Sequence, residues 1–496
     1  MNSHVTVAAG LGRVAVIDIG SNTVRLVVYD GKARVPLLMF NEKTAAGLGR
    51  NLAETGQLNP RGVDRAKAAL TRFHRLAEAM RLDRIHILAT AAVREAEDGP
   101  GFADWVQQLF EEPVEVLSGE EEARLAAEGV LCSVNYPDGV VGDMGGGSLD
   151  LIAVEGQQFG AYDTLPFGHL KVAELASDGL KSARKIIAAR MNQLDWVKER
   201  SGHTLYAVGG SWRALAGLFM EMIGHPLSVI DNFTLDAETV QNLLNDSVFS
   251  KGWPGNMSKA VSQKRIETLP HAGLALSELI RVMAPETVVF SGFGLREGRF
   301  FTGLEHHRQE EDPLIAGCES IMSHYARFGF DGHEVNTWLA PLFSGENLRE
   351  ERVRLATCIV ADIAATDHPD HQADHGFFRV LWLPVPGLTH SERAQMGVAV
   401  AHRYNKGRNL PAVKKVLPLM SHREMRNASV IGNGLRLAHV LSGAVPGLIS
   451  TTELKAEGDC LVLVLPHDGA VYSSETVERR LANLANAASF ASWEIR

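Results

Sequence analysis

The chain has 496 residues, 45% hydrophobic and 22% charged, a composition that excludes a largely disordered protein. At about 150 residues per domain, this length predicts three or four domains. The formal charge is −10, with 49 basic against 59 acidic residues, which argues against a general nucleic-acid-binding protein. The four cysteines form no CxxC pair, which excludes a disulfide scaffold and a cysteine-rich zinc module and favours a reducing compartment.

Neither export nor membrane insertion is expected. No stretch reaches the roughly 18 consecutive apolar residues of a membrane span, and the N-terminus lacks the basic region of a signal peptide. We therefore expect a soluble cytoplasmic protein with no membrane or nucleic-acid partner. A polyanionic ligand would have to be held by a local basic track, by metal ions or by backbone N–H groups.

The N-terminal part alternates predicted strands and helices, which indicates an α/β layered fold. Residues 14–19 and 24–29 are predicted strands, and Asn59 is placed to cap a helix over residues 60–80. Two more strands are predicted at residues 85–89 and 114–117. Thr90 is placed to cap the helix that follows the first of them.

The C-terminal part has a different pattern. A polar linker follows residue 305, a helical pattern covers residues 314–420, and the rest indicates a small α+β unit. The predicted domains are therefore residues 1–131, 132–305, 314–420 and 421–496.

A repeat is the most informative feature of the N-terminal part. VIDIGSNTVRLVV (residues 16–28) aligns without gaps on VGDMGGGSLDLIA (residues 141–153), at an offset of 125 residues. Both segments read strand, Asp, Gly, small or polar residues, Thr or Ser, strand. Two unrelated β-hairpins would explain the glycines, because glycine favours tight turns. They would not explain why Asp and a hydroxyl residue occupy matching places.

Two further glycine loops follow predicted strands, at residues 209–211 and 291–294. Each is compatible with a simple strand-to-helix turn. Four such loops in one chain favour a duplicated α/β unit whose cleft is lined by backbone N–H groups, which bind phosphate. Asp18 and Asp143 beside the first two loops either cap their own turns or hold a Mg²⁺ ion through water.

Two charged residues outside the loops also have two interpretations each. Ser118 and Glu121 fit a helix-capping box, and Glu121 could equally be a general base at a rigid helix start. Arg94 suits bidentate phosphate contact but could instead pair at the surface with Glu95 or Glu97.

Six segments in this order resemble the exopolyphosphatase/guanosine pentaphosphate phosphohydrolase family: VIDIGSNTVRLVVYD, ATAAVREA, LSGEEEARL, GDMGGGSLDLI, YAVGGSWRALA and SGFGLREG. They cover about residues 14–300. The resemblance implies two duplicated ribonuclease H-like (actin-like) domains, then a mainly helical HD-like domain and a small C-terminal α+β domain. It also implies Mg²⁺-dependent removal of terminal phosphate from inorganic polyphosphate or from pppGpp.

The resemblance also implies roles for single residues. Glu121 would be the water-activating base, and Arg94 would clamp a phosphate. Mg²⁺ would be held by Asp143, with Asp18 and Asp150 as further ligands. Asp150 stands where the family usually has Glu, so its carboxylate is one methylene shorter and its role is less certain. The phosphate-binding residues would be Gly20, Ser21, Asn22, Thr23, Gly145, Gly146, Gly147, Ser148, Gly209, Gly210 and Ser211.

The C-terminal half has two further polar features. Three histidines and three aspartates alternate as a possible metal cluster: Asp367, His368, Asp370, His371, Asp374 and His375. Where HD phosphohydrolases carry a His-Asp pair this chain has Ala361 and Asp362, so a polar surface is favoured over a catalytic metal there.

Residues 403–426 hold seven basic residues against one acid, Glu424, a local charge of +6. This segment is either a solvated basic face or a track that guides a long phosphate polymer. Lys414 and Lys415 belong to it, and Lys264 and Arg265 are further candidates.

The sequence thus predicts an exopolyphosphatase, with pppGpp hydrolysis as the alternative. Two other classes stay open: an ATP-dependent kinase of the same superfamily, and a nucleotide-binding regulator without turnover. Resemblance to long family members also implies a homodimer.

Overall fold

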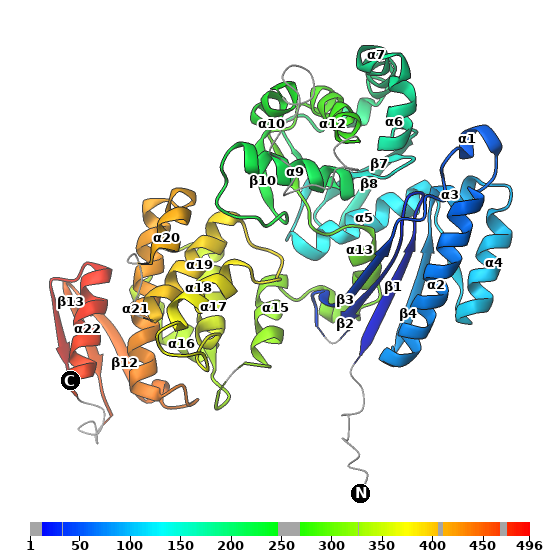
Figure 1. The fold of residues 1–496 in the computed structure, drawn as a ribbon. Helices are drawn as coiled ribbons and strands as arrows, with labels where there is room; N and C mark the ends of the chain where they lie inside the picture. The colour runs from blue at the N-terminus through cyan, green and yellow to red at the C-terminus, as the bar shows by residue number, and fades with distance from the viewer. Residues whose placement is uncertain (1–11, 32, 247–267, 326, 405–409, 467–473) are drawn as a thin grey trace, which may run out of the picture. The chain divides into compact units, whose positions relative to one another are not determined.

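The computed structural model describes residues 12–31, 33–246, 268–325, 327–404, 410–466 and 474–496. The chain divides into two compact units, Met1–Glu311 and Asp312–Arg496 (Figure 1). This division falls in the predicted linker. The predicted boundaries at residues 131/132 and 420/421 lie inside the two units and stay predictions.

The first sheet has five strands in the order β3-β2-β1-β4-β5. Strands β1 to β3 form an antiparallel meander, and β4 and β5 extend the sheet parallel to β1. The strands are β1 (Arg13–Ile19), β2 (Val24–Asp30), β3 (Leu37–Thr44), β4 (Arg84–Ala89) and β5 (Val114–Val116).

The second sheet repeats this topology. Its order is β10-β11-β9-β6-β7-β8, in which β6 to β8 form the meander and β9 and β11 are the parallel additions. Strand β10 is an extra antiparallel edge. The repeat seen in the sequence is therefore a repeat of a whole sheet. The strands are β6 (Asp138–Met144), β7 (Leu149–Glu155), β8 (Gln158–Leu165), β9 (Thr204–Val208), β10 (Phe233–Asp236) and β11 (Thr287–Phe290).

Helices cover both faces of each sheet in the first unit. They are α1 (Leu52–Thr55), α2 (Pro60–Met80), α3 (Ala91–Glu95), α4 (Gly99–Phe110), α5 (Gly119–Ser133), α6 (His169–Leu175), α7 (Leu180–Met191), α8 (Asp195–Lys198), α9 (Gly210–Met222), α10 (Ala237–Leu244), α12 (Leu269–Met283), α13 (Leu295–Thr302) and α14 (His306–Gln309). Asn59 caps α2 as predicted, by accepting a hydrogen bond from the N–H of Gly62. The predicted cap by Thr90 is wrong, because its side chain makes no capping bond at α3.

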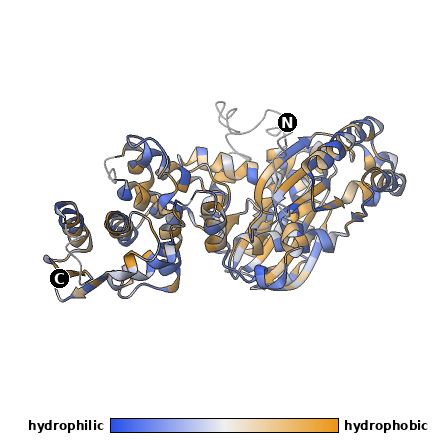
Figure 2. Ribbon diagram, turned by 90° about the horizontal axis from the view of Figure 1, so that it is seen from below, coloured by the Kyte–Doolittle hydropathy of each residue, from blue (hydrophilic) through white to orange (hydrophobic). Residues whose placement is uncertain are grey.

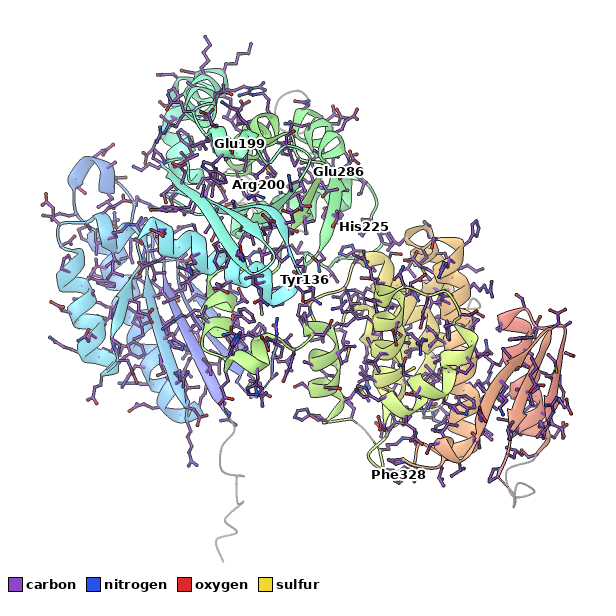
Figure 3. The ribbon with its side chains drawn as sticks, turned by 180° about the vertical axis from the view of Figure 1, so that it is seen from behind. Tyr136, Glu199, Arg200, His225, Glu286 and Phe328 are labelled. Atoms are coloured by element: carbon purple, nitrogen blue, oxygen red, sulfur yellow. The ribbon has the colours of Figure 1, made fainter. Side chains whose placement is uncertain are left out.

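The strands bury apolar side chains on both faces, and apolar residues are coloured orange on the ribbon in Figure 2. One face of the first sheet packs on α2 and α4, with Phe73 and Phe102 in a shared core, and the other receives Phe300 of α13. In the second sheet Trp212 of α9 is buried on one face and Ala127 of α5 on the other. Arg200, which is labelled in Figure 3, lies 3.7 Å from Asp138 at the end of β6 away from its glycine turn.

Helices α5 and α13 join the two sheets through a glycine contact. A Cβ on Gly298 would lie 1.8 Å from the carbonyl oxygen of Leu125, and one on Gly129 would lie 2.3 Å from that of Gly294. The two helix backbones therefore approach more closely than any other residue type allows.

The second unit is helical and ends in a three-stranded sheet of order β12-β13-β14. This confirms the predicted helical and α+β parts. The elements are α15 (Pro313–Met322), α16 (Gly332–Leu339), α17 (Leu348–Ile359), α18 (Gln372–Leu381), α19 (His390–Arg403), α20 (Pro411–Val416), α21 (His422–Ser442), β12 (Glu453–Glu457), β13 (Cys460–Val464), α22 (Glu475–Ala488) and β14 (Ser492–Ile495). Within the described ranges, no helix is both long and apolar enough to cross a bilayer.

The helix contact makes a stability prediction. Gly298→Ala should lower the free energy of unfolding by about 2–3 kcal/mol, because its Cβ would overlap a backbone oxygen that cannot move alone. Gly217→Ala in α9 is the matched control: nothing lies within 4 Å of its Cβ position, so it should be neutral or slightly stabilising. Thermal denaturation measures both, and equal melting temperatures for the two variants would contradict the proposed close approach.

Candidate active site

The turns of the two repeated hairpins are closed by the same backbone hydrogen bond. In the β1–β2 turn the N–H of Gly20 donates to the carbonyl of Thr23 at 2.9 Å, and in the β6–β7 turn the N–H of Gly145 donates to the carbonyl of Ser148 at 3.0 Å. The gapless alignment of the two segments therefore has a structural basis.

The two turns also lie against each other. A Cβ built on Gly146 would be 3.6 Å from the Cβ of Ser21, and one on Gly147 would be 3.8 Å from that of Ala91 at the start of α3. The first loop, the second loop and α3 thus meet at one place. The structure brings together the loops that the sequence predicted to share a ligand.

Neighbouring segments hold the carbonyl groups of both loops. The carbonyls of residues 145–147 accept hydrogen bonds of 3.0–3.1 Å from the N–H groups of residues 168–170, and those of Ser21 and Asn22 accept at 2.9 Å from Gly49 and Gly47. In the described structure the N–H groups of Gly146 and Gly147 donate to no protein acceptor. These two donors are therefore available for an anion.

The third predicted loop also reaches this place. Gly209 has a φ of +103°, and a Cβ there would lie 2.8 Å from Oδ1 of Asp143, so only glycine fits. Gly210 begins α9. The hydroxyl of Ser211 lies 3.2 Å from Nδ1 of His169, which is itself 2.9 Å from the carbonyl of Gly145.

Carboxylates crowd one side of the loops. Asp143 and Asp150 face each other in the β6–β7 register, and Asp150 is 3% and Glu122 8% exposed. Burial, followed by the charge of Asp150, raises the pKa of Asp143 to about 7 and that of Glu122 to about 8. Burial also raises the pKa of Asp150 to about 6.

Glu121 and Glu122 lie in different surroundings. From sequence, Glu121 was expected either to cap the helix or to act as the general base. The capping box is confirmed: the carboxylate of Glu121 accepts from the N–H of Ser118 at 2.8 Å, and this bond is the main cause that lowers its pKa. Glu121 is exposed. The next residue points about 100° further round the helix, which places Glu122 among the buried aspartates. The role of Glu121 as base stays untested, and the geometry favours Glu122.

Arg94 is held in this corner rather than at the surface. Its Nη1 donates to Oε1 of Glu122 and to the carbonyl of Leu117, both at 2.5 Å. A weaker contact of 3.7 Å reaches Glu95. Arg94 therefore orients Glu122 and lies near the loops where a phosphate would bind.

One carboxylate in the corner has an oxygen to spare for a ligand. The hydroxyl of Ser148 donates to Oδ2 of Asp150 at 2.8 Å, whereas Oδ1 is buried and lacks a close hydrogen-bond partner among the described residues, although the nearby hydroxyl of Thr164 also lowers the pKa of Asp150. In the described residues no three potential ligand side chains are close enough to hold a metal ion by themselves. Mg²⁺ is usually held by one or two carboxylates with water and substrate phosphate, so Asp143 and Asp150 fit it.

Three arginines for which the sequence predicted no role lie in or beside the first hairpin, which carries Asp18. Arg296 of α13 is 8% exposed and reaches within 4.0 Å of Asp18. Burial, and then the charges of Arg296 and Arg213, lower the pKa of Arg25 to about 10. A signal for Arg25 was present in the repeat, where it occupies the position of Asp150 in the other hairpin.

The predicted basic residues do not form one track. Arg403 is buried and pairs with Asp362 at 2.6 Å, and Arg423 pairs with Glu350. Lys414 and Lys415 are exposed on α20 and keep their predicted role untested. Lys264, Arg265, Lys406 and Arg408 lie outside the described residues.

The histidine cluster in the second unit is exposed. The rings of His371 and His375 stack with centroids 5.8 Å apart, and His375 contacts Asp367 at 3.0 Å. These side chains are among the described residues, none of which forms a three-ligand metal group. The exposed side chains are compatible with the polar surface that the sequence favoured, and metal binding here stays untested.

The model of the Ppx/GppA phosphatase family matches residues 27–307, and that of the exopolyphosphatase C-terminal region matches residues 329–492. The chain belongs to the Ppx/GppA phosphatase family. A relative from Vibrio parahaemolyticus, guanosine-5'-triphosphate,3'-diphosphate pyrophosphatase, is 25% identical over 90% of this chain and 91% of its own. Retrograde regulation protein 2 of Saccharomyces cerevisiae is 25% identical over 80% and 73%.

Two solved structures support the fold of the first unit. The Aquifex aeolicus Ppx/GppA family member has a TM-score of 0.51 and 24% identity, covering 60% of this chain and 99% of its own. An exopolyphosphatase from Cytophaga hutchinsonii has a TM-score of 0.52 and 19% identity, covering 59% and 99%. The expected duplicated actin-like fold is confirmed.

The carboxylate corner predicts how stability depends on pH. The raised pKa values mean that the folded protein binds more protons than the unfolded chain between about pH 4 and pH 8, so these groups lower stability as pH rises. Asp143→Asn removes one of the three groups and should reduce this part of the slope by about a third or more, because the charge of Asp143 also raises the pKa of Glu122.

Melting temperatures between pH 5 and pH 8, measured in a chelator, test this prediction. Asp104→Asn, at an exposed position on α4, should leave the slope unchanged. A wild-type slope in Asp143→Asn would show that Asp143 binds no extra proton in the folded protein, and would contradict its raised pKa.

Proposed function

We propose that this family member is an exopolyphosphatase that releases orthophosphate from the end of a polyphosphate chain. The observation that carries the proposal is a buried glutamate, Glu122, in the same corner as two glycine loops, the second of which offers the free N–H groups of Gly146 and Gly147. This corner offers a base for water and an anion site for the terminal phosphate. The charge that develops during phosphoryl transfer needs such preorganised donors.

The reaction follows from these groups. The carboxylate of Glu122 takes a proton from water as the water oxygen forms a bond to the terminal phosphorus. The anhydride P–O bond breaks, and the shortened chain leaves with negative charge on its new terminal oxygen. A pKa near the working pH suits a general base, and the hydrogen bond from Arg94 favours the ionised form.

Backbone donors and Arg94 position the phosphate. The N–H groups of Gly146 and Gly147 would hold its non-bridging oxygens, and Arg94, already turned to Glu122, would bring phosphate and base together. Asp143 and Asp150, with Asp18 nearby, would hold Mg²⁺, which when bound neutralises phosphate charge.

The second candidate is pppGpp hydrolysis. The relative from Vibrio parahaemolyticus, which is similar over nine-tenths of this chain, is named for a guanosine 5'-triphosphate,3'-diphosphate substrate. Terminal phosphates of both substrates present the same group to the loops. A homodimer and a cytoplasmic location are further proposals; the free cysteines support a reducing compartment.

A substitution pair tests which glutamate is the base. Glu122→Gln should lower kcat by about 10²–10⁴-fold while substrate still binds, since only proton transfer is lost. Glu121→Gln can still form the capping box and should retain most activity. Phosphate release from polyphosphate measures both. A large loss in Glu121→Gln with none in Glu122→Gln would restore the original assignment and contradict this mechanism.

Metal removal is the next test. Chelation should abolish phosphate release and Mg²⁺ should restore it. Mg²⁺ should also raise the melting temperature of wild type more than that of Asp150→Asn, because a ligand stabilises only the fold that binds it. Full activity in chelator would exclude the metal.

Side-by-side assays on polyphosphate, pppGpp and ATP without an acceptor separate the hydrolase from a kinase.

A further inference from the structure

A basic pocket adjoins the first glycine loop on its outer side. It has a volume of about 450 Å³ and is lined by Arg50, Asn59, Pro60, Arg61 and Arg65. Three of the five lining residues are arginines and none is acidic. The mechanism proposed above uses none of them.

The charges in this pocket are not neutralised by neighbours. Within the described chain Arg50, Arg61 and Arg65 form no ion pair, and the side chain of Arg65 donates only to the carbonyl of Arg61, at 3.1 Å. All three are exposed, with Asp64 between Arg61 and Arg65 on α2, so the pocket offers three accessible guanidinium groups to an anion. The first turn of α2, capped by Asn59, adds the positive end of a 21-residue helix.

The pocket and the first loop share one segment. The N–H of Gly49 donates to the carbonyl of Ser21 at 2.9 Å, and Arg50 is the next residue. The N–H of Gly47 donates a hydrogen bond to the carbonyl of Asn22. A Cβ built on Gly47 would lie 3.9 Å from Nη2 of Arg65. An anion extending from the loop past this segment would therefore reach the arginines.

We infer that this pocket binds internal phosphates of a polyphosphate chain whose terminal phosphate lies at the glycine loops. This inference rests on the proposed function and adds a substrate subsite to it. Guanidinium groups suit the repeated, densely charged phosphates of such a chain. A longer chain brings more of its phosphates to the arginines, so the pocket should set the preference for long chains.

The experiment compares two double variants on the same helix. Arg61→Gln with Arg65→Gln removes two pocket charges; Arg72→Gln with Arg75→Gln removes two charges from α2 that do not line the pocket. The pocket variant should raise KM for long polyphosphate about tenfold and leave kcat and the KM for tripolyphosphate unchanged. Its salt dependence of long-chain binding should also be shallower, by about two in the logarithmic slope. The control should match wild type.

Direct binding keeps the inference separate from turnover. Adding the pocket substitutions to Glu122→Gln should weaken its binding of long polyphosphate by the same factor, about tenfold. Equal effects on long and short chains, or none, would overturn the subsite. A loss for pppGpp alone would also overturn it, since the pocket would then hold a nucleotide diphosphate. If wild type releases no phosphate from any polyphosphate, the proposed function fails instead.

Discussion

The burial of three carboxylates is the constraint on which the site in the first unit depends. Glu122, Asp143 and Asp150 share one corner, and among the described residues only Arg94 forms an ion pair with any of them. Each acid has a raised pKa because burial and a neighbouring carboxylate penalise its charge. Such an arrangement lowers the stability of the ligand-free protein, and the proposed cation, bound together with phosphate, would relieve it.

The two hairpins have the same turn but differ in charge. The position opposite Asp18 in the first hairpin is Arg25, and the position opposite Asp143 in the second is Asp150. The second hairpin therefore brings two carboxylates for a cation beside its own loop N–H groups, while the first balances its carboxylate with an arginine and has Arg296 and Arg213 nearby. After the duplication, the two hairpins thus came to differ in one charged side chain.

Much of the first unit could be predicted from sequence. The repeat predicted two hairpins with matching turns, and the meeting of Ser21 and Gly146 confirms that they share one place. Strands β3, β8, β10 and β14 were not predicted. All four lie at sheet edges, where side chains are mostly exposed and the apolar alternation that marks a strand is weak.

Which residues form the site depends on three-dimensional contacts that residue spacing in the sequence does not reveal. A capping box is visible in sequence, but the direction in which the next side chain points depends on what packs against α5. Arg94 and Glu122 are 28 residues apart, and no local pattern indicates their contact. The basic segment at residues 403–426 was predicted from composition, which cannot tell that Arg403 is buried against Asp362.

The central claim is that the carboxylate corner and the glycine loops bind one metal–phosphate unit. A crystal structure of Glu122→Gln soaked with Mn²⁺ and tripolyphosphate tests it most directly, because anomalous scattering locates the metal independently of the phosphate. The account predicts an anomalous peak beside Oδ1 of Asp150, with the terminal phosphate on the N–H groups of Gly146 and Gly147. A peak elsewhere, or phosphate bound away from these loops, would contradict it.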